Sequence, residues 1–195
     1  MAGELDYSLP PAVRRIARAF SRVGWTSFWI QIVLAVVSSL LLLFAVIGLN
    51  FNSANQSSPG TGAGLFFAAC GLLAVFFGAY WSFRYTRLAR LLRSGDMASR
   101  PKPKDAIQTL HIGLNASLIG MFLTLMGAGA IVGALLFKSF EQPAQGAMLF
   151  NPATLRGSFI TSFDLLIVQS NTNTSIAHFV AIISSLWLFR TVNRQ

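Results

Sequence analysis

The sequence has few charged residues, and two long stretches have none. Asp, Glu, Lys and Arg make up 11% of its 195 residues and hydrophobic residues 54%, whereas roughly 25% of the residues of soluble domains are charged. No charged residue occurs from Val23 to Phe83 or from Ala106 to Phe137. Because so few charges could not cover the surface of a water-soluble domain, this scarcity excludes a soluble globular fold.

Cysteine is almost absent, and recognisable enzyme motifs are missing. Cys70 is the only cysteine, which excludes an intramolecular disulfide. The chain contains no GxSxG, no Walker phosphate-binding loop and no HExxH, the patterns that mark common hydrolases, nucleotide-binding proteins and zinc proteases. We therefore expect no enzymatic activity and no cofactor.

Four apolar segments are long enough to cross a membrane. About 20 helical residues cross the roughly 30 Å of bilayer hydrocarbon. Segments of sufficient length lie at about residues 25–49, 65–85, 106–137 and 164–190. The sequence therefore predicts an all-α polytopic membrane protein, whose four transmembrane helices form one domain over residues 24–195.

The distribution of basic residues predicts the orientation of these spans. Every Lys and Arg except Lys138 and Arg156 falls on one side of the membrane. Because basic segments stay in the cytoplasm, we expect both termini there. The same bias accounts for the net charge of +9, which in a soluble protein would suggest nucleic acid. We expect anionic lipid headgroups as partners, and no nucleic acid.

Residues 1–23 are expected to be a polar tail followed by an amphipathic helix at the membrane interface. Apolar residues recur at helical spacing from residue 13 to residue 23, and another face carries Arg14, Arg18 and Arg22. Gly24 offers a break before the first span; the alternative is that this segment only extends that span. A second set of arginines, expected near anionic headgroups where the second span ends, is Arg84, Arg87 and Arg90.

Glycines recur every seven residues in the two middle spans. The first set is Gly64, Gly71 and Gly78, and the second is Gly113, Gly120 and Gly127. Since lipid provides no hydrophobic drive between helices, small residues that permit close backbone approach hold membrane bundles together. We expect spans two and three to pack closely through these glycines. The pair Gly129 and Gly133 has the GxxxG spacing and predicts a further close contact, toward another copy of the chain.

The fourth span is interrupted by polar residues from 169 to 175. It is either one helix or a shorter helix after a partial re-entry. As a helix it would turn Asp164, Asn171, Ser175 and His178 in one direction. An ionisable residue within a membrane is a functional-site hypothesis by default. The candidate polar pathway is Asp164, Gln169, Asn173, Ser175 and His178. The alternative for His178 is a neutral side chain that is hydrogen-bonded across the bundle.

Three groups of residues resemble one known family. They are Gly24-Trp25 with Ser27-Phe28-Trp29 and Gln31; Trp81-Ser82-Phe83 with Arg87-Leu88; and Asp164 with Val168-Gln169, Asn173 and His178-Phe179. This pattern resembles the family of the chloroplast inner-envelope Tic subunit that is also described as a plastid iron permease. The likeness covers nearly the whole chain from about residue 20, and the last group is the most specific.

The resemblance implies a four-helix membrane protein of protein import or iron transport. Plant members of the family carry a transit peptide. Because the segment before the first span is short, we expect none here, which is similar to the cyanobacterial forms. The location implied is a cyanobacterial inner or thylakoid membrane.

Two functions fit these observations. The first is a permease or permease subunit with iron as one candidate cargo; His178 is a weak candidate metal ligand without a dense set of further ligands. Because four spans make only a narrow bundle, such a permease should form a homo-oligomer or join a larger membrane complex. The second is a non-transporting subunit of a protein-import translocon or of a photosynthetic membrane complex, with an assembly or docking role.

Overall fold

The computed structural model describes residues 11–52, 59–93, 103–141 and 162–193. They form four α-helices, α2 (Pro11–Asn52), α3 (Pro59–Arg93), α4 (Pro103–Glu141) and α5 (Ser162–Asn193), and no strand occurs in these ranges. Three of the helices begin at a proline, whose missing N–H is not needed in a first turn. All four are long and apolar enough to cross a membrane. The predicted all-α fold with four transmembrane helices is confirmed.

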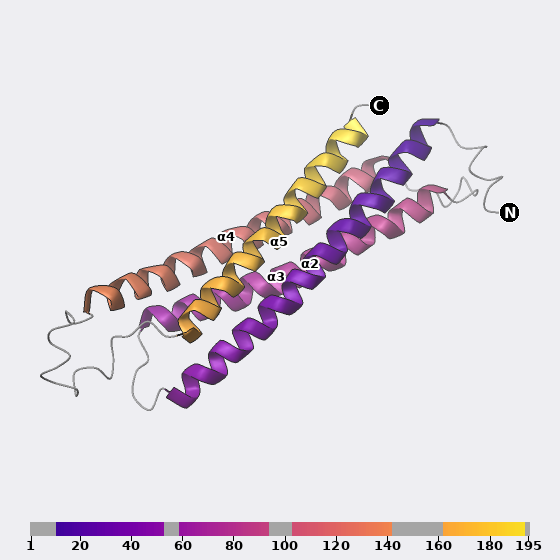
Figure 1. Cartoon of the computed structure of the whole chain (residues 1–195). Helices are drawn as coiled ribbons and strands as arrows, with labels where there is room; N and C mark the ends of the chain where they lie inside the picture. The colour runs from indigo at the N-terminus through magenta and orange to yellow at the C-terminus, as the bar shows by residue number, and fades with distance from the viewer. Residues whose placement is uncertain (1–10, 53–58, 94–102, 142–161, 194–195) are drawn as a thin grey trace, which may run out of the picture.

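The four helices form an up-and-down bundle (Figure 1). Each helix packs against the next one along the chain, α5 closes the ring against α2, and α3 and α5 also touch across the diagonal. The start of α2 and the end of α5 lie at the same end of the bundle. We name this the basic end, because the arginines of α2 and of the last turns of α3 lie there.

Large apolar side chains face outward, and small or polar side chains fill the interior. Phe122 and Leu73 are more than 60% exposed, whereas Ala35, Ser38 and Thr124 are fully buried. This order reverses that of a soluble bundle, because hydrocarbon solvates large apolar groups and helices in lipid associate through close packing and interhelical hydrogen bonds. The outer surface of the structure is therefore suited to contact lipid chains.

The first helix has no break at Gly24, and the expected separate interfacial helix is instead the first part of α2. Gly24 is buried against α3, where an added Cβ would lie 3.0 Å from the Ser82 carbonyl oxygen. Phe20 and Tyr85 meet edge to face in the same region. The apolar face of residues 13–23 therefore packs inside the bundle. The structure agrees with the alternative prediction, in which this segment extends the first span. Residues 1–10 lie outside the described residues.

The polar stretch of α5 does not interrupt the helix. The hydroxyl groups of Thr172, Thr174 and Ser175 donate to the backbone carbonyl four residues earlier, at 2.8–3.0 Å. These bonds satisfy the hydroxyl hydrogens within the helix itself, so a polar segment can remain helical in a membrane. Of the two alternatives for this span, the structure has one unbroken helix.

Candidate functional site

The structure divides the five residues of the candidate polar pathway into two groups. Asp164 and His178 are buried in the bundle, and Ser175 is half-buried on the same side of α5. Gln169 is exposed, and its side-chain amide donates to the Asn173 side chain at 3.1 Å on the outer face of α5. A route through the interior could therefore use Asp164, Ser175 and His178, whereas Gln169 and Asn173 face away from it.

Asp164 is paired with Lys138 of α4 at the end of the bundle opposite the basic end. The Lys138 Nζ atom lies 3.3 Å and 3.4 Å from the two carboxylate oxygens. The Asp164 side chain is 3% exposed and the Lys138 side chain 18%. Because a buried charge is expensive in this setting, the pairing with Lys138 helps to neutralise the Asp164 carboxylate.

His178 lies at the contact between α5 and the two middle helices. Its Nε2 atom is 3.1 Å from the carbonyl oxygen of Gly71, and since a carbonyl only accepts, Nε2 carries the hydrogen. An added Cβ at Gly120 would overlap the imidazole ring. The described residues contain no group of three or more His, Cys, Asp or Glu side chains that could hold a metal ion. Among the described residues, His178 therefore acts as a hydrogen-bond donor from α5 to α3.

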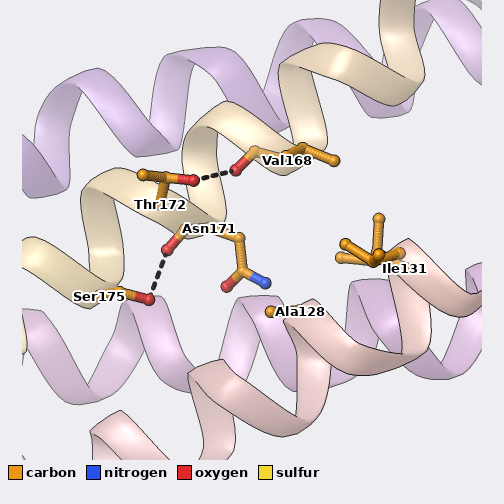
Figure 2. A pocket seen from close by; sticks show the side chains of 7 residues that line it. Ala128, Ile131, Val168, Asn171, Thr172 and Ser175 are labelled. Atoms are coloured by element: carbon orange, nitrogen blue, oxygen red, sulfur yellow. Dashed lines mark hydrogen bonds between the residues drawn. The ribbon is translucent and has the colours of Figure 1, made fainter.

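A cavity of about 120 Å³ lies between α4 and α5 (Figure 2). Among the described residues its lining is Ala128, Ile131, Val132, Val168, Asn171, Thr172 and Ser175. Asn171 is 4% exposed, and its side-chain amide points from α5 toward Ala128. Neither its Nδ2 nor its Oδ1 atom has a hydrogen-bond partner among the groups the structure describes. Every other lining polar side chain is bonded to its own helix.

A second polar cluster joins α2 and α3 nearer the basic end. The Gln31 Nε2 atom lies 2.8 Å from both the Ser27 and the Ser82 hydroxyl oxygens. Gln31 and Ser27 are each 1% exposed. Interhelical hydrogen bonds of this kind fix the register of neighbouring membrane helices. All three residues belong to the sequence groups that resemble a known family, yet the sequence alone did not show that they meet.

Two further polar contacts bind α5 to its neighbours. Ser38 of α2 and Ser170 of α5 each donate to the other's backbone carbonyl, at 3.1 Å and 2.9 Å. The Tyr85 and Ser185 hydroxyl groups are 3.2 Å apart. Small hydroxyl side chains allow this close approach, so the polar residues of α5 serve mainly as contacts to α2 and α3 on this side.

The glycines of the middle helices lie at helix contacts, most of them between α3 and α4, whereas Gly78 faces Gln31 of α2 and Gly120 also faces His178 of α5. An added Cβ would meet Ile131 at Gly64, Thr124 at Gly71, Tyr85 and Trp81 at Gly113, and the backbone of Ala68 at Gly127; at Gly78 it would meet Gln31. In contrast, Gly129 and Gly133 are exposed and have no atom within 4 Å of an added Cβ. They lie on the outer surface of α4, open to a partner.

The predicted headgroup arginines lie at the basic end. Those that are exposed are Arg18, Arg22, Arg84, Arg87 and Arg90, whereas Arg14 is half-buried. The Arg84 guanidinium lies 4.5 Å from the centroid of the Trp81 ring, and the Trp81 Nε1 atom donates to the Thr109 carbonyl at 2.6 Å. Trp81 thus anchors one arginine while it joins α3 to α4.

Sequence reasoning missed the pairing of Lys138 with Asp164 and the cluster around Gln31. A signal for the pair was present, because Lys138 is one of two basic residues on its side of the predicted membrane and Asp164 begins the next span. A signal for the cluster was the spacing of Ser27 and Gln31: they are four residues apart, so they lie on the same face of a helix. Neither signal names the partner on the other helix.

Comparison with known proteins adds a family and a relative. The family model described as "Protein of unknown function (DUF3611)" matches residues 10–193. The protein named "Protein TIC 21, chloroplastic" from Arabidopsis thaliana is 32% identical over 183 residues, which cover 92% of this chain and 58% of that protein. The chain therefore spans less than two thirds of the length of this relative. No solved structure matches.

Proposed function

Because the chain belongs to the DUF3611 family and is a Tic21-like integral membrane protein, we propose that it is a permease subunit. The proposed cargo is iron, which the family resemblance implies. The relative's name points equally to the Tic system, so the choice between transport and import rests on the chemistry of the bundle.

The observation that carries the proposal is the polar inward face of α5. This helix buries polar side chains from one end to the other: Asp164, Ser170, Asn171, Thr174, His178 and Ser185. Polar and ionisable groups in a membrane interior are costly and mark substrate or ion pathways in many transporters. Asp164 and His178 are the two ionisable side chains on this face, and ionisable residues within a membrane are the ones that most often belong to a pathway.

Apart from the cavity between α4 and α5, the interior of one copy is closed where the structure describes it. At the buried glycines Gly64, Gly71, Gly113 and Gly120 there is no room for even a methyl group. His178 and Asp164 are both engaged. Transport would therefore require either a movement of α5 or a second subunit. We propose a homo-oligomer, with the exposed Gly129 and Gly133 surface of α4 as the contact.

Iron flux into proteoliposomes tests the proposal. We expect the double variant His178→Ala with Asp164→Asn to lower the rate of Fe²⁺ uptake at least about tenfold, which corresponds to about 1.4 kcal/mol in the barrier. The control is Gln169→Ala with Asn173→Ala, because these side chains face outward and should leave uptake unchanged. Uptake that is equal in both double variants would reject the α5 route, and no uptake by the parent protein would reject the permease.

The closed interior also favours a second candidate, a non-transporting subunit of an import translocon or photosynthetic membrane complex. Its docking surfaces would be the arginines of the basic end and the lipid-facing surface of α4. This candidate requires that the protein migrates with a larger assembly after mild solubilisation and that the isolated protein gives no flux. Migration as a homo-oligomer alone would count against it.

A further inference from the structure

The cavity between α4 and α5 contains a side chain whose hydrogen-bonding needs the bundle does not meet. Asn171 is only 4% exposed. Neither polar atom of its side-chain amide has a hydrogen-bond partner among the described groups. A carboxamide has two N–H donors and an oxygen acceptor. In hydrocarbon nothing else can compensate for these bonds, so the position of Asn171 calls for an occupant of the cavity.

The lining restricts the chemistry of this occupant. The seven lining residues that the structure describes include no acidic or basic side chain, and a charge without a counter-charge is unfavourable at membrane depth. The hydroxyl hydrogens of Thr172 and Ser175 are already donated to the carbonyls of Val168 and Asn171, so these groups can only accept. An occupant should therefore be uncharged, accept from the Asn171 amide nitrogen, and donate to the oxygens.

The size and place of the cavity fit a small solute. A water molecule needs about 10–15 Å³ of such space, so about 120 Å³ holds several waters or one small amide. Asn171 is seven residues from both Asp164 and His178, about 10 Å along the helix in each direction. An acyl chain could fill the space from the lipid side, but it could not hydrogen-bond the amide.

We propose that the cavity between α4 and α5 is a hydrated binding site for small uncharged solutes that both donate and accept hydrogen bonds, with the Asn171 amide as its polar anchor. Water is the smallest such solute, and urea and formamide belong to the same class. The cavity offers neither a carboxylate nor an imidazole to a metal ion, so the binding of these solutes does not depend on iron transport. It can exist whether or not the protein is a permease.

Cysteine modification in lipid nanodiscs tests the proposal on the full chain with Cys70→Ala as background. Ser175→Cys places a thiol in the lining, and Ile176→Cys places one at the same depth on the lipid-facing surface, where Ile176 is 46% exposed. The reagent is methyl methanethiosulfonate, which is uncharged like the proposed solutes and reacts with thiolates, so it requires water at the thiol. We expect modification of Ser175→Cys to be at least about tenfold faster than that of Ile176→Cys.

Two further measurements separate a hydrated site from general accessibility. Asn171→Leu should slow modification of Ser175→Cys to the rate of Ile176→Cys, because it removes the anchor and fills the space. Formamide should also slow the modification of Ser175→Cys, and it should do so more than dimethylformamide, which has no N–H donor. This comparison keeps the Asn171 side chain, so it does not depend on whether the Asn171→Leu variant folds. Equal slow rates at positions 175 and 176 would overturn the proposal, as would equal protection by the two amides.

Discussion

Asp164 and Lys138 are far apart in the sequence but meet at the end of the bundle opposite the arginines. Their burial is unequal, since the carboxylate side chain is 3% exposed and the lysine side chain 18%. Removal of one partner from a buried pair leaves an uncompensated charge, whereas removal of both does not. The pair therefore links the ends of α4 and α5. Its net contribution to the free energy of unfolding is small, although the loss of one partner alone is costly.

A double-mutant cycle checks this coupling. We expect Lys138→Met to lower the free energy of unfolding by about 3 kcal/mol, the lower end of the range for buried pairs, because one partner is partly exposed. The double variant Lys138→Met with Asp164→Leu should recover most of this loss. Unfolding in mixed detergent and dodecyl sulfate micelles measures both. A double variant that is as unstable as Lys138→Met would show that the lysine contributes through something other than this pair.

At the scale of elements, the contact between α3 and α4 depends on which glycine positions lie inside it. Gly127 and Gly129 are only two residues apart in α4, yet they face opposite environments. A Cβ at Gly127 would lie 3.0 Å from the backbone nitrogen of Ala68, whereas one at Gly129 would meet nothing within 4 Å. Backbone atoms cannot move aside as a side chain can, so the two positions should tolerate alanine very differently.

This contrast gives a matched pair of variants. Gly127→Ala should destabilise the bundle by about 1–3 kcal/mol, the usual cost of overpacking, whereas Gly129→Ala should leave the fold as stable as the parent. If α4 joins two copies through Gly129 and Gly133, then Gly129→Ala should shift the protein from oligomer to monomer. Thermal unfolding and the mass of the detergent-solubilised particle are the measurements. Equal destabilisation by the two variants would contradict the packing described here.

At the scale of the whole molecule, the even number of helices brings the start of α2 and the end of α5 to one end of the bundle (Figure 1). The arginines gathered there favour the cytoplasm through the positive-inside rule, and this orientation remains a prediction.

Tags at the two termini test the orientation. In sealed right-side-out vesicles, we expect both tags to resist an added protease until the membrane is opened by detergent, because both would lie on the cytoplasmic side. A tag inserted near residue 55, between α2 and α3, serves as the control and should be cleaved at once. Cleavage of only one terminal tag would contradict the four-span arrangement itself.

The same end should bind anionic lipid. Exposed arginines near a membrane surface gain about 1 kcal/mol each from anionic headgroups, so the triple variant Arg84→Gln, Arg87→Gln and Arg90→Gln should lose roughly 3 kcal/mol of lipid-dependent stabilisation. The measurement is the difference in unfolding between vesicles of phosphatidylglycerol and of phosphatidylcholine. In pure phosphatidylcholine the variant and the parent should be alike; an equal loss there would point to a structural role for these arginines.

The sequence by itself determined the number of membrane-crossing helices and the asymmetry of charge. It could do so because a bilayer imposes one length and one polarity on every span, and these constraints act on each segment independently. The glycine repeat also indicated that the second and third spans pack against each other, because glycines seven residues apart lie on one face of a helix.

Only the tertiary structure decided which polar residues meet. Gln169 and His178 belong to the same polar region of α5, but one faces outward and bonds to Asn173 while the other donates to Gly71 of α3. The break expected at Gly24 is absent because α3 covers that glycine. Such outcomes depend on the neighbouring helix, because a polar group in lipid is placed by its partner, and hydropathy and periodicity describe one helix at a time.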